Sequence, residues 1–299
     1  MGAGLDRLRR PIVVGRSPSA SLGGAVTYPL LIAIVVTAAT WDAWRWYVAR
    51  VSATPEEAVS LAATAILLIA LGVARAPRPA ALRPFALVQT AILLGVYASS
   101  YALLPPIMRA ALAIAATLFA LHLAVFKERP PVAFWGLVAL ALPVVPSLQF
   151  VLGYPMRVVS ATLAVALLQA QGLAVARQGT FLLWHGEMVD FDAPCSGVNM
   201  LWAGLLLTLM GCVLFRLGAI KVAVAIALSV ALSIASNALR AASLFYVEAG
   251  FFAGAPEWWH DGIGLAAFTA SSMATLWLLG RLRELKPPEL KPPDPETMS

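Results

Sequence analysis

The sequence predicts an all-α polytopic membrane protein of about eight transmembrane helices, with a small extracytoplasmic helix and a β-hairpin before the sixth span. Of its 299 residues, 61% are hydrophobic and 12% are charged, and the mean hydropathy is +0.83. Soluble domains are about 45–50% apolar and about 25% charged, so the composition excludes a soluble fold. Apolar runs of about 20 residues, long enough to cross a bilayer as helices, recur along the chain.

Basic residues cluster between these apolar runs, so the net charge of +6 is a signal of topology rather than of nucleic-acid binding. We expect residues 1–282 to form a single membrane domain, with the functional motifs in 153–282. The segment 283–299 is rich in proline and charge, which predicts a disordered cytoplasmic tail. The expected spans are 23–41, 58–74, 85–104, 107–126, 131–149, 197–215, 219–243 and 263–280.

The segment between the fifth and sixth spans has a different character. Residues 153–176 are apolar but carry polar and helix-breaking interruptions, so we expect them to lie on the membrane or dip into it without crossing. Residues 178–194, QGTFLLWHGEMVDFDAP, combine strand-forming residues with a polar turn at His185-Gly186-Glu187, which is typical of a β-hairpin outside the bilayer. The interruptions of the first part are Pro155, Arg157, Gln169, Gln171 and Gly172.

The distribution of basic residues predicts the orientation. With a cytoplasmic N-terminus and no crossing at 153–176, 15 of the 21 Lys and Arg residues lie inside, as the positive-inside rule requires. A full crossing at 153–176 would invert the last three spans and place the cluster from Arg281 to Lys291 outside. We therefore expect both termini to be cytoplasmic. The six basic residues expected outside are Arg45, Arg50, Arg109, Arg157, Arg177 and Arg240.

The stretch FDAPCSGVNML places a cysteine at the outer end of the sixth span. Cys195 follows Asp-Ala-Pro at a predicted helix start, where free backbone N–H groups and the helix dipole favour a thiolate. Cys212 lies roughly 25 Å further along the same predicted helix, so the two thiols cannot pair. We interpret Cys212 as an apolar filler, Ser196 as a helper or helix cap, and Gly197 as room for the substrate backbone.

Two more reactive side chains return to the same edge of the membrane. Arg240, in NALRAASL, has apolar sequence on both sides and Asn237 one turn earlier on the same face, so an inward, functional role explains it at least as well as snorkelling to head groups. His260, in EWWHDGIG, lies in the loop just before the eighth span, although its tryptophans also fit an interfacial belt. The hairpin of the sixth and seventh spans should bring Cys195, Arg240 and His260 to one surface.

These residue types suit acyl transfer. A thiolate attacks a carbonyl carbon, a histidine moves the proton, and a fixed cation stabilises the oxyanion. His185 in the hairpin turn is a further candidate for substrate contact, although a solvated turn explains it equally. A zinc site from Cys195, His185 and His260 would lack close-spaced ligand pairs, so we expect no metal and no cofactor.

PCSGVNML with Cys195, NALRAASL with Arg240 and HDGIG with His260 resemble, in order and spacing, the motifs of the exosortase/archaeosortase family. The resemblance spans about residues 85–282, with the motifs in 194–264. It implies a membrane-embedded cysteine protease/transpeptidase with these three residues catalytic and Asn237 accompanying Arg240. It also implies that the chain lies in the bacterial inner membrane. Its substrates would be exported proteins with a C-terminal PEP-CTERM-like motif, a transmembrane helix and a basic tail.

A non-enzymatic transporter or assembly scaffold is the alternative. A transporter would carry its polar residues near the bilayer midplane in broken helices, often in two similar halves, whereas here they gather at one edge. A thiol at Cys195 that reacts with an external probe would favour the enzyme. In either case we expect membrane lipids, and not nucleic acid, as partners.

Overall fold

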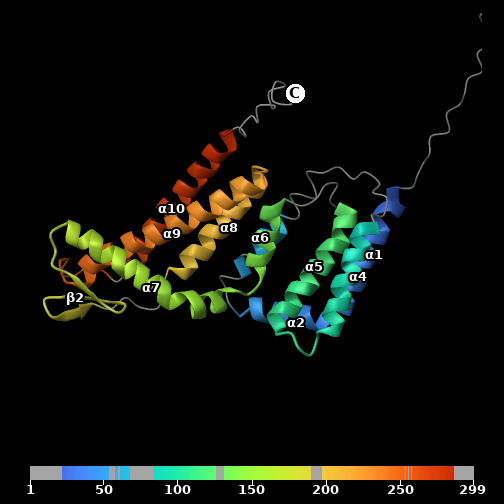
Figure 1. Ribbon diagram of the computed structural model, residues 1–299, viewed down its shortest axis with the longest axis horizontal. Coiled ribbons are helices and arrows are strands. Elements are labelled where there is room, and N and C mark those ends of the chain that lie inside the picture. Colours follow the sequence, from blue (N-terminus) through green and yellow to red (C-terminus); the bar gives the residue numbers. More distant parts are fainter. Residues whose placement is uncertain are drawn as a thin grey trace, which may run out of the picture.

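The computed structural model shows a mostly helical chain with one small antiparallel sheet (Figure 1). Among the residues that the structure describes, three helices are long and apolar enough to cross a membrane, and shorter apolar helices accompany them. The long helices are α7 (Val145–Ala170), α9 (Ala219–Glu248) and α10 (Trp258–Glu284). The structure describes residues 22–53, 58–59, 61–67, 84–125, 131–189, 197–252, 254, 256 and 258–285.

The N-terminal part contains three of the expected apolar helices, and two of them pack on the third. They are α1 (Leu22–Ala39), α4 (Pro84–Ser99) and α5 (Pro106–Val125). Helices α1 and α4 both lie against α5, and all three agree with the runs expected there. The run expected at 58–74 lies partly outside the described residues, of which 58–59 and 61–67 are helical.

An amphipathic helix that the sequence analysis did not predict follows α1. This helix, α2 (Trp41–Val51), buries Ala43, Tyr47 and Val51 and exposes the polar positions between them. The Tyr47 hydroxyl donates a 2.7 Å hydrogen bond to the carbonyl oxygen of Ala141, at the end of α6. Helix α2 therefore joins the N-terminal helices to the part of the chain that follows.

The fifth span was expected as one run at 131–149, and this expectation is wrong. The run divides into α6 (Val132–Ala141) and the start of α7. Leu142 precedes Pro143 and has extended backbone angles (φ −67°, ψ 152°), because a residue before proline avoids the helical region. Pro146 then suits the first turn of α7, where no amide donor is needed.

Helix α7 is also longer than the small helix expected after residue 153. It is one 26-residue helix that continues through Pro155. In Figure 1 it crosses α9, which it contacts, rather than running alongside it. Its length would permit a membrane crossing, whereas its direction differs from that of the helices on which it packs.

The expected β-hairpin is confirmed and gains a third strand. Strands β1 (Ala176–Gln178), β2 (Phe181–Trp184) and β3 (Glu187–Val189) form an antiparallel sheet in the order β1-β2-β3. The β2–β3 turn consists of His185 (φ 51°) and Gly186 (φ 86°), the left-handed pair that a tight two-residue hairpin requires. Leu182 of β2 packs with α7 and with the end of α9 in one apolar cluster.

Helix α8 (Val198–Leu214) packs between α6, α9 and α10. Glycines permit close approaches at two of these contacts. A Cβ at Gly136 would lie 2.9 Å from Leu209, and a Cβ at Gly211 would lie 2.5 Å from Leu279. Small residues at helix contacts are typical of membrane bundles, where packing rather than the hydrophobic effect joins helices.

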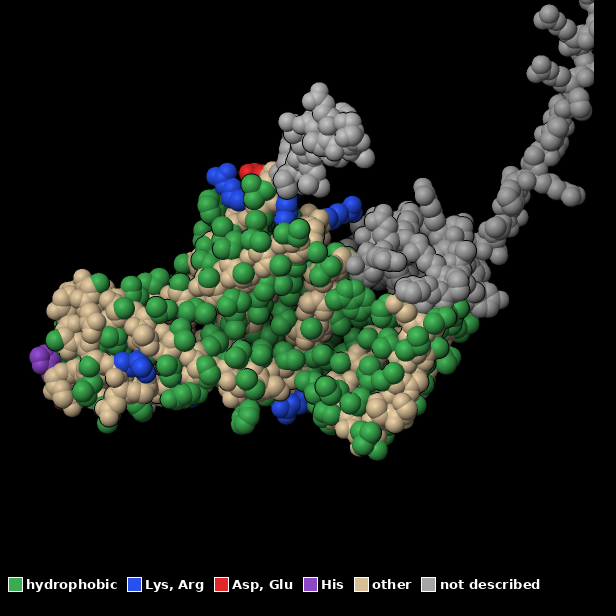
Figure 2. Space-filling model, in the orientation of Figure 1, with side chains coloured by type: hydrophobic (Ala, Val, Ile, Leu, Met, Phe, Trp, Pro, Cys, Tyr) green, Lys and Arg blue, Asp and Glu red, His purple; other side chains and the backbone are tan. Residues whose placement is uncertain are grey.

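Basic side chains lie at the top of the view, where α10 ends, and along its lower edge, and the surface between them is largely hydrophobic (Figure 2). One end holds Arg216 and Lys221 at the α8–α9 turn and Arg281 and Arg283 near the end of α10. The Arg283 guanidinium lies over the Phe215 ring, 5.5 Å from its centroid. Helix α10 extends to Glu284, into the segment expected as a tail, and residues 286–299 lie outside the described part.

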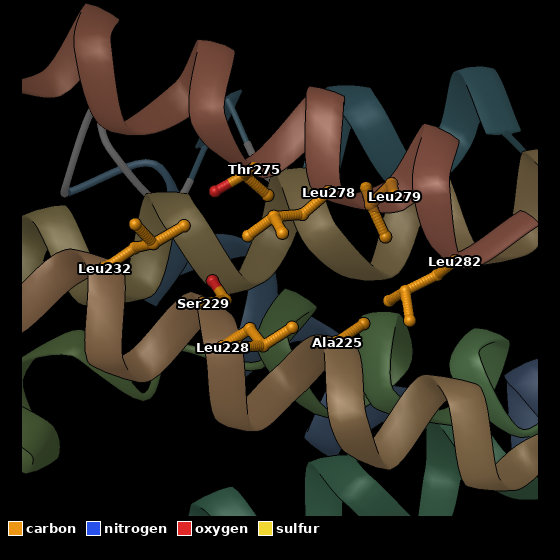
Figure 3. A pocket seen from close by; sticks show the side chains of 8 residues that line it. All are labelled: Ala225, Leu228, Ser229, Leu232, Thr275, Leu278, Leu279 and Leu282. Carbon is orange, nitrogen blue, oxygen red and sulfur yellow. The ribbon is translucent and has the colours of Figure 1, made fainter.

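Toward the end of the α9–α10 pair that carries Lys221 and Arg281, the space between the two helices is small and apolar (Figure 3). Its volume is about 10 Å³, close to the minimum that holds one water molecule. Six aliphatic side chains line it together with Ser229 and Thr275. At this level the α9–α10 interface is packed and has no room for a solute.

Candidate active site

Asn237 lies on α9 and is almost completely buried, with 1% of its surface exposed. Its side-chain nitrogen, Nδ2, donates a 2.8 Å hydrogen bond to Oγ of Ser160, which is on α7. The two residues are 77 positions apart in sequence, so this contact depends on the crossing of α7 over α9. The contact connects α7, the helix that crosses α9, with the face of α9 that carries Arg240. Arg240 lies one turn after Asn237 on that face.

Gly197 is the N-cap of α8 and lies directly against Asn237. It has a left-handed backbone conformation (φ 76°), which glycine adopts without strain. A Cβ at this position would come within 2.6 Å of Cγ and Nδ2 of Asn237. The structure thus gives a reason for glycine that the sequence analysis did not foresee, namely the close approach of Asn237.

The guanidinium group of Arg240 packs against Gly264 in α10. A Cβ at Gly264 would lie 3.2 Å from Nε and 3.4 Å from Cζ of Arg240. The Nε atom is buried and has no hydrogen-bond partner within the described part of the chain. Buried donors are normally satisfied, so this nitrogen is available to a further acceptor at the site.

His260 lies in the first turn of α10, not in the preceding loop as the sequence analysis expected. Its side chain is about one-third exposed (35%), and its Nδ1 is 3.5 Å from the carboxylate of Asp261. Gly264 follows His260 by four residues and therefore lies on the same helix face, one turn away. Arg240 packs on Gly264, so its guanidinium lies against α10 one turn along that helix from His260.

Among the expected site residues, Gly197 contacts Asn237, and Arg240 contacts Gly264, one turn along α10 from His260. His185 belongs to a different group: its ring lies edge-on to Trp184, with 4.4 Å between the ring centroids. Within the described residues, no hydrogen bond or ring contact joins His185 to Arg240. Cys195 and Ser196 lie outside the described residues.

Sequence reasoning missed Ser160 and Gly264. Gly264 was within the HDGIG motif, and its spacing of four residues from His260 was a usable signal. Ser160 is a polar residue within an apolar run, and polar residues inside membrane helices usually contact another polar group. Its partner, Asn237, becomes evident only from the fold.

The fold and this cluster define a multi-span helical membrane protein with a polar site at one end of its helices. A protein-family model described as transmembrane exosortase matches residues 23–278. The chain belongs to the transmembrane exosortase family. No curated protein and no solved structure matches it.

Proposed function

We propose that this protein is a cysteine protease/transpeptidase that cleaves the C-terminal sorting signal of exported proteins at the outer face of the bacterial cytoplasmic membrane. The signal is a PEP-CTERM-like motif followed by a transmembrane helix and a basic tail. The observation that carries the proposal is the buried Nε of Arg240, unpaired within the described residues, beside the His260 face of α10. Family membership supports the same class of activity.

Cys195 is the proposed nucleophile, with Ser196 as a supporting residue. Cys195 precedes Gly197 by two residues. Consecutive Cα atoms are about 3.8 Å apart, so covalent geometry keeps the Cα atom of Cys195 within about 7.6 Å of that of Gly197. Gly197 touches Asn237, which lies one turn from Arg240, and this contact supports a proposed site in which the Cys195 thiol acts with the Arg240 cation.

The proposed reaction begins when the Cys195 thiolate bonds to the scissile carbonyl carbon. Arg240 donates to the resulting oxyanion, and the C–N bond then breaks as the protonated imidazole of His260 gives its proton to the leaving amine. An acceptor amine or water attacks the thioester, its proton passes to His260, and the C–S bond breaks to restore the thiolate. Arginine suits the oxyanion because it keeps its charge when partly desolvated.

The distribution of charge supports an extracytoplasmic site. Arg216, Lys221 and Arg281 lie at the end of the helices opposite to His260, and basic residues mark the cytoplasmic side. In this proposal residues 1–282 form one domain of about eight spans, α7 lies along the outer surface with the sheet, and both termini are cytoplasmic. The crossing of α7 over α9 supports this placement of α7.

The test is processing of a co-expressed substrate that carries the three-part signal. Cys212 is fully buried and is replaced by alanine, so that Cys195 is the one remaining thiol of the chain. We expect Cys195→Ser to abolish processing and to remove labelling by a membrane-impermeant thiol reagent, whereas Ser196→Ala should retain much of the activity. Normal processing by Cys195→Ser would refute the proposal.

A further inference from the structure

We propose that Ser160 is a positioning residue: it fixes the Asn237 side chain against Gly197, the N-cap of α8, which follows the proposed nucleophile Cys195 by two residues in the sequence. This inference rests on the proposed function. The proposed role brings α7 into the site, although this helix contains none of the three residues proposed to react.

The contact is buried on both sides. Ser160 is 4% exposed and Asn237 is 1% exposed, and the distance from Oγ to Nδ2 is 2.8 Å. In such surroundings a donor that loses its acceptor cannot turn to water instead, so the bond favours one orientation of the amide group. The same amide group fills the space that a side chain at position 197 would need.

The entry to α8 depends on outside support because its own N-cap is a glycine, with no side chain to bond the first amide groups. Helix α7 supplies that support at three points. Met156 packs with Val198 and Leu201 in one buried apolar cluster. In the first turn of α8, Nε2 of Gln149 donates a 3.1 Å hydrogen bond to Oδ1 of Asn199. Helix α7 therefore contacts the start of α8 directly through Gln149 and Met156, and indirectly through the Ser160–Asn237 bond.

The measurement is the pH profile of Cys195 alkylation by an impermeant thiol reagent, made in the Cys212→Ala protein alongside substrate processing. This profile reports on the surroundings of the thiol without requiring turnover. We expect Ser160→Ala to shift the profile and to slow processing on the order of 10-fold, the usual effect of stranding a buried donor. A stranded buried donor also lowers the stability of the fold, so Tm should fall somewhat, and processing is compared at matched abundance.

Two controls separate positioning from a general loss of structure. Ser229 is also a buried serine, on α9, with no hydrogen-bond partner for its Oγ in the described residues, so Ser229→Ala should leave the profile and the rate unchanged. Ser160→Thr and Ser160→Val have nearly the same shape but differ in the hydroxyl group. The threonine variant should therefore process substrate faster than the valine variant even if both fold less well than the parent.

The route through Asn237 is tested by a double-mutant cycle. If Ser160 acts through Asn237, Ser160→Ala should change the alkylation rate by less than about twofold in an Asn237→Ala background. An equal effect in both backgrounds, or a Ser160→Ala protein identical to the parent, would overturn the inference. Failure of the proposed function is a separate outcome. It would be seen as substrate processing that survives Cys195→Ser, whereas the effect of Ser160 is measured by alkylation of Cys195 and does not require processing.

Discussion

The guanidinium group of Arg240 lies so close to the backbone of Gly264 that a Cβ there would be 3.2 Å from Nε. Gly264 is one turn from His260 on α10, so this contact places the guanidinium against the helix that carries the imidazole. The absence of a side chain at position 264 is thus part of the proposed site.

Gly264→Ala should displace the Arg240 side chain and slow processing on the order of 10-fold, because small misplacements of a catalytic group are costly. Helix stability should not suffer, since alanine is the better helix former. Gly262→Ala is the matched control: its Cβ would meet only Trp258, at 3.4 Å. Equal processing rates for the two variants would show that the Arg240–Gly264 contact has no functional role.

Arg240→Lys keeps the charge but loses the planar group that can donate from several nitrogens at once. If Arg240 holds the oxyanion, the rate should fall by about 100- to 1000-fold, enough for uncleaved precursor to accumulate.

His260→Ala should likewise leave substrate bound and uncut. Immunoblots of the co-expressed substrate, at matched enzyme abundance, provide the measurement. If both variants process substrate at the parent rate, neither residue is catalytic, and the hairpin segment 185–192 becomes the next candidate.

Gly197→Ala combines two penalties, a left-handed backbone for a residue with a Cβ and a 2.6 Å approach to the Asn237 side chain. We expect a lower Tm and a loss of processing greater than about 100-fold, since the turn next to Cys195 must move. Gly218→Ala provides the comparison. Gly218 is also a helix N-cap, but it has φ −70° and no atom within 4 Å of a Cβ. A Gly197→Ala protein that matches Gly218→Ala in both measurements would contradict the close contact.

The long apolar runs predicted α1, α4, α5, α8, α9 and α10 because hydrophobic length is the main requirement for a membrane helix. The run at 131–149 was predicted as one helix because it is apolar throughout. The helix is interrupted at Leu142, whose backbone is extended because it precedes Pro143. Helix α2 was missed because Asp42 and Arg45 make it too polar to resemble a span. It is amphipathic instead, with a pattern of burial that the packing reveals.

The candidate site likewise has features that the sequence predicted and features that it did not. The return of Arg240 and His260 to one end follows from the order of α9 and α10, so the sequence predicted it. The Ser160–Asn237 bond joins residues 77 positions apart and depends on the direction of α7, which hydrophobicity does not determine. The closeness of Gly197 to Asn237 likewise depends on how α8 and α9 pack.

Topology is the prediction on which the extracytoplasmic site depends. We expect His185 and His260 to face outside and Arg216 and the C-terminal tail to face the cytoplasm. Reporter fusions at Gly186 and Ser299 test this, and single cysteines test it with less disturbance. In a Cys195→Ser/Cys212→Ala background, Met188→Cys uses a 64% exposed position in the sheet, and Glu284→Cys uses a 71% exposed side chain at the end of α10.

An impermeant maleimide applied to spheroplasts should label Met188→Cys at once and Glu284→Cys only after the membrane is permeabilised. The reason is the positive-inside rule acting on Arg216, Lys221 and Arg281, which keep the Glu284 end in the cytoplasm. Both positions are well exposed, so a failure to react reflects the membrane rather than burial. Labelling of Glu284→Cys in sealed spheroplasts, with Met188→Cys protected, would place Arg240 and His260 on the cytoplasmic side. Exported substrates could not then meet the site after crossing the membrane, and the proposed function would fail with the topology.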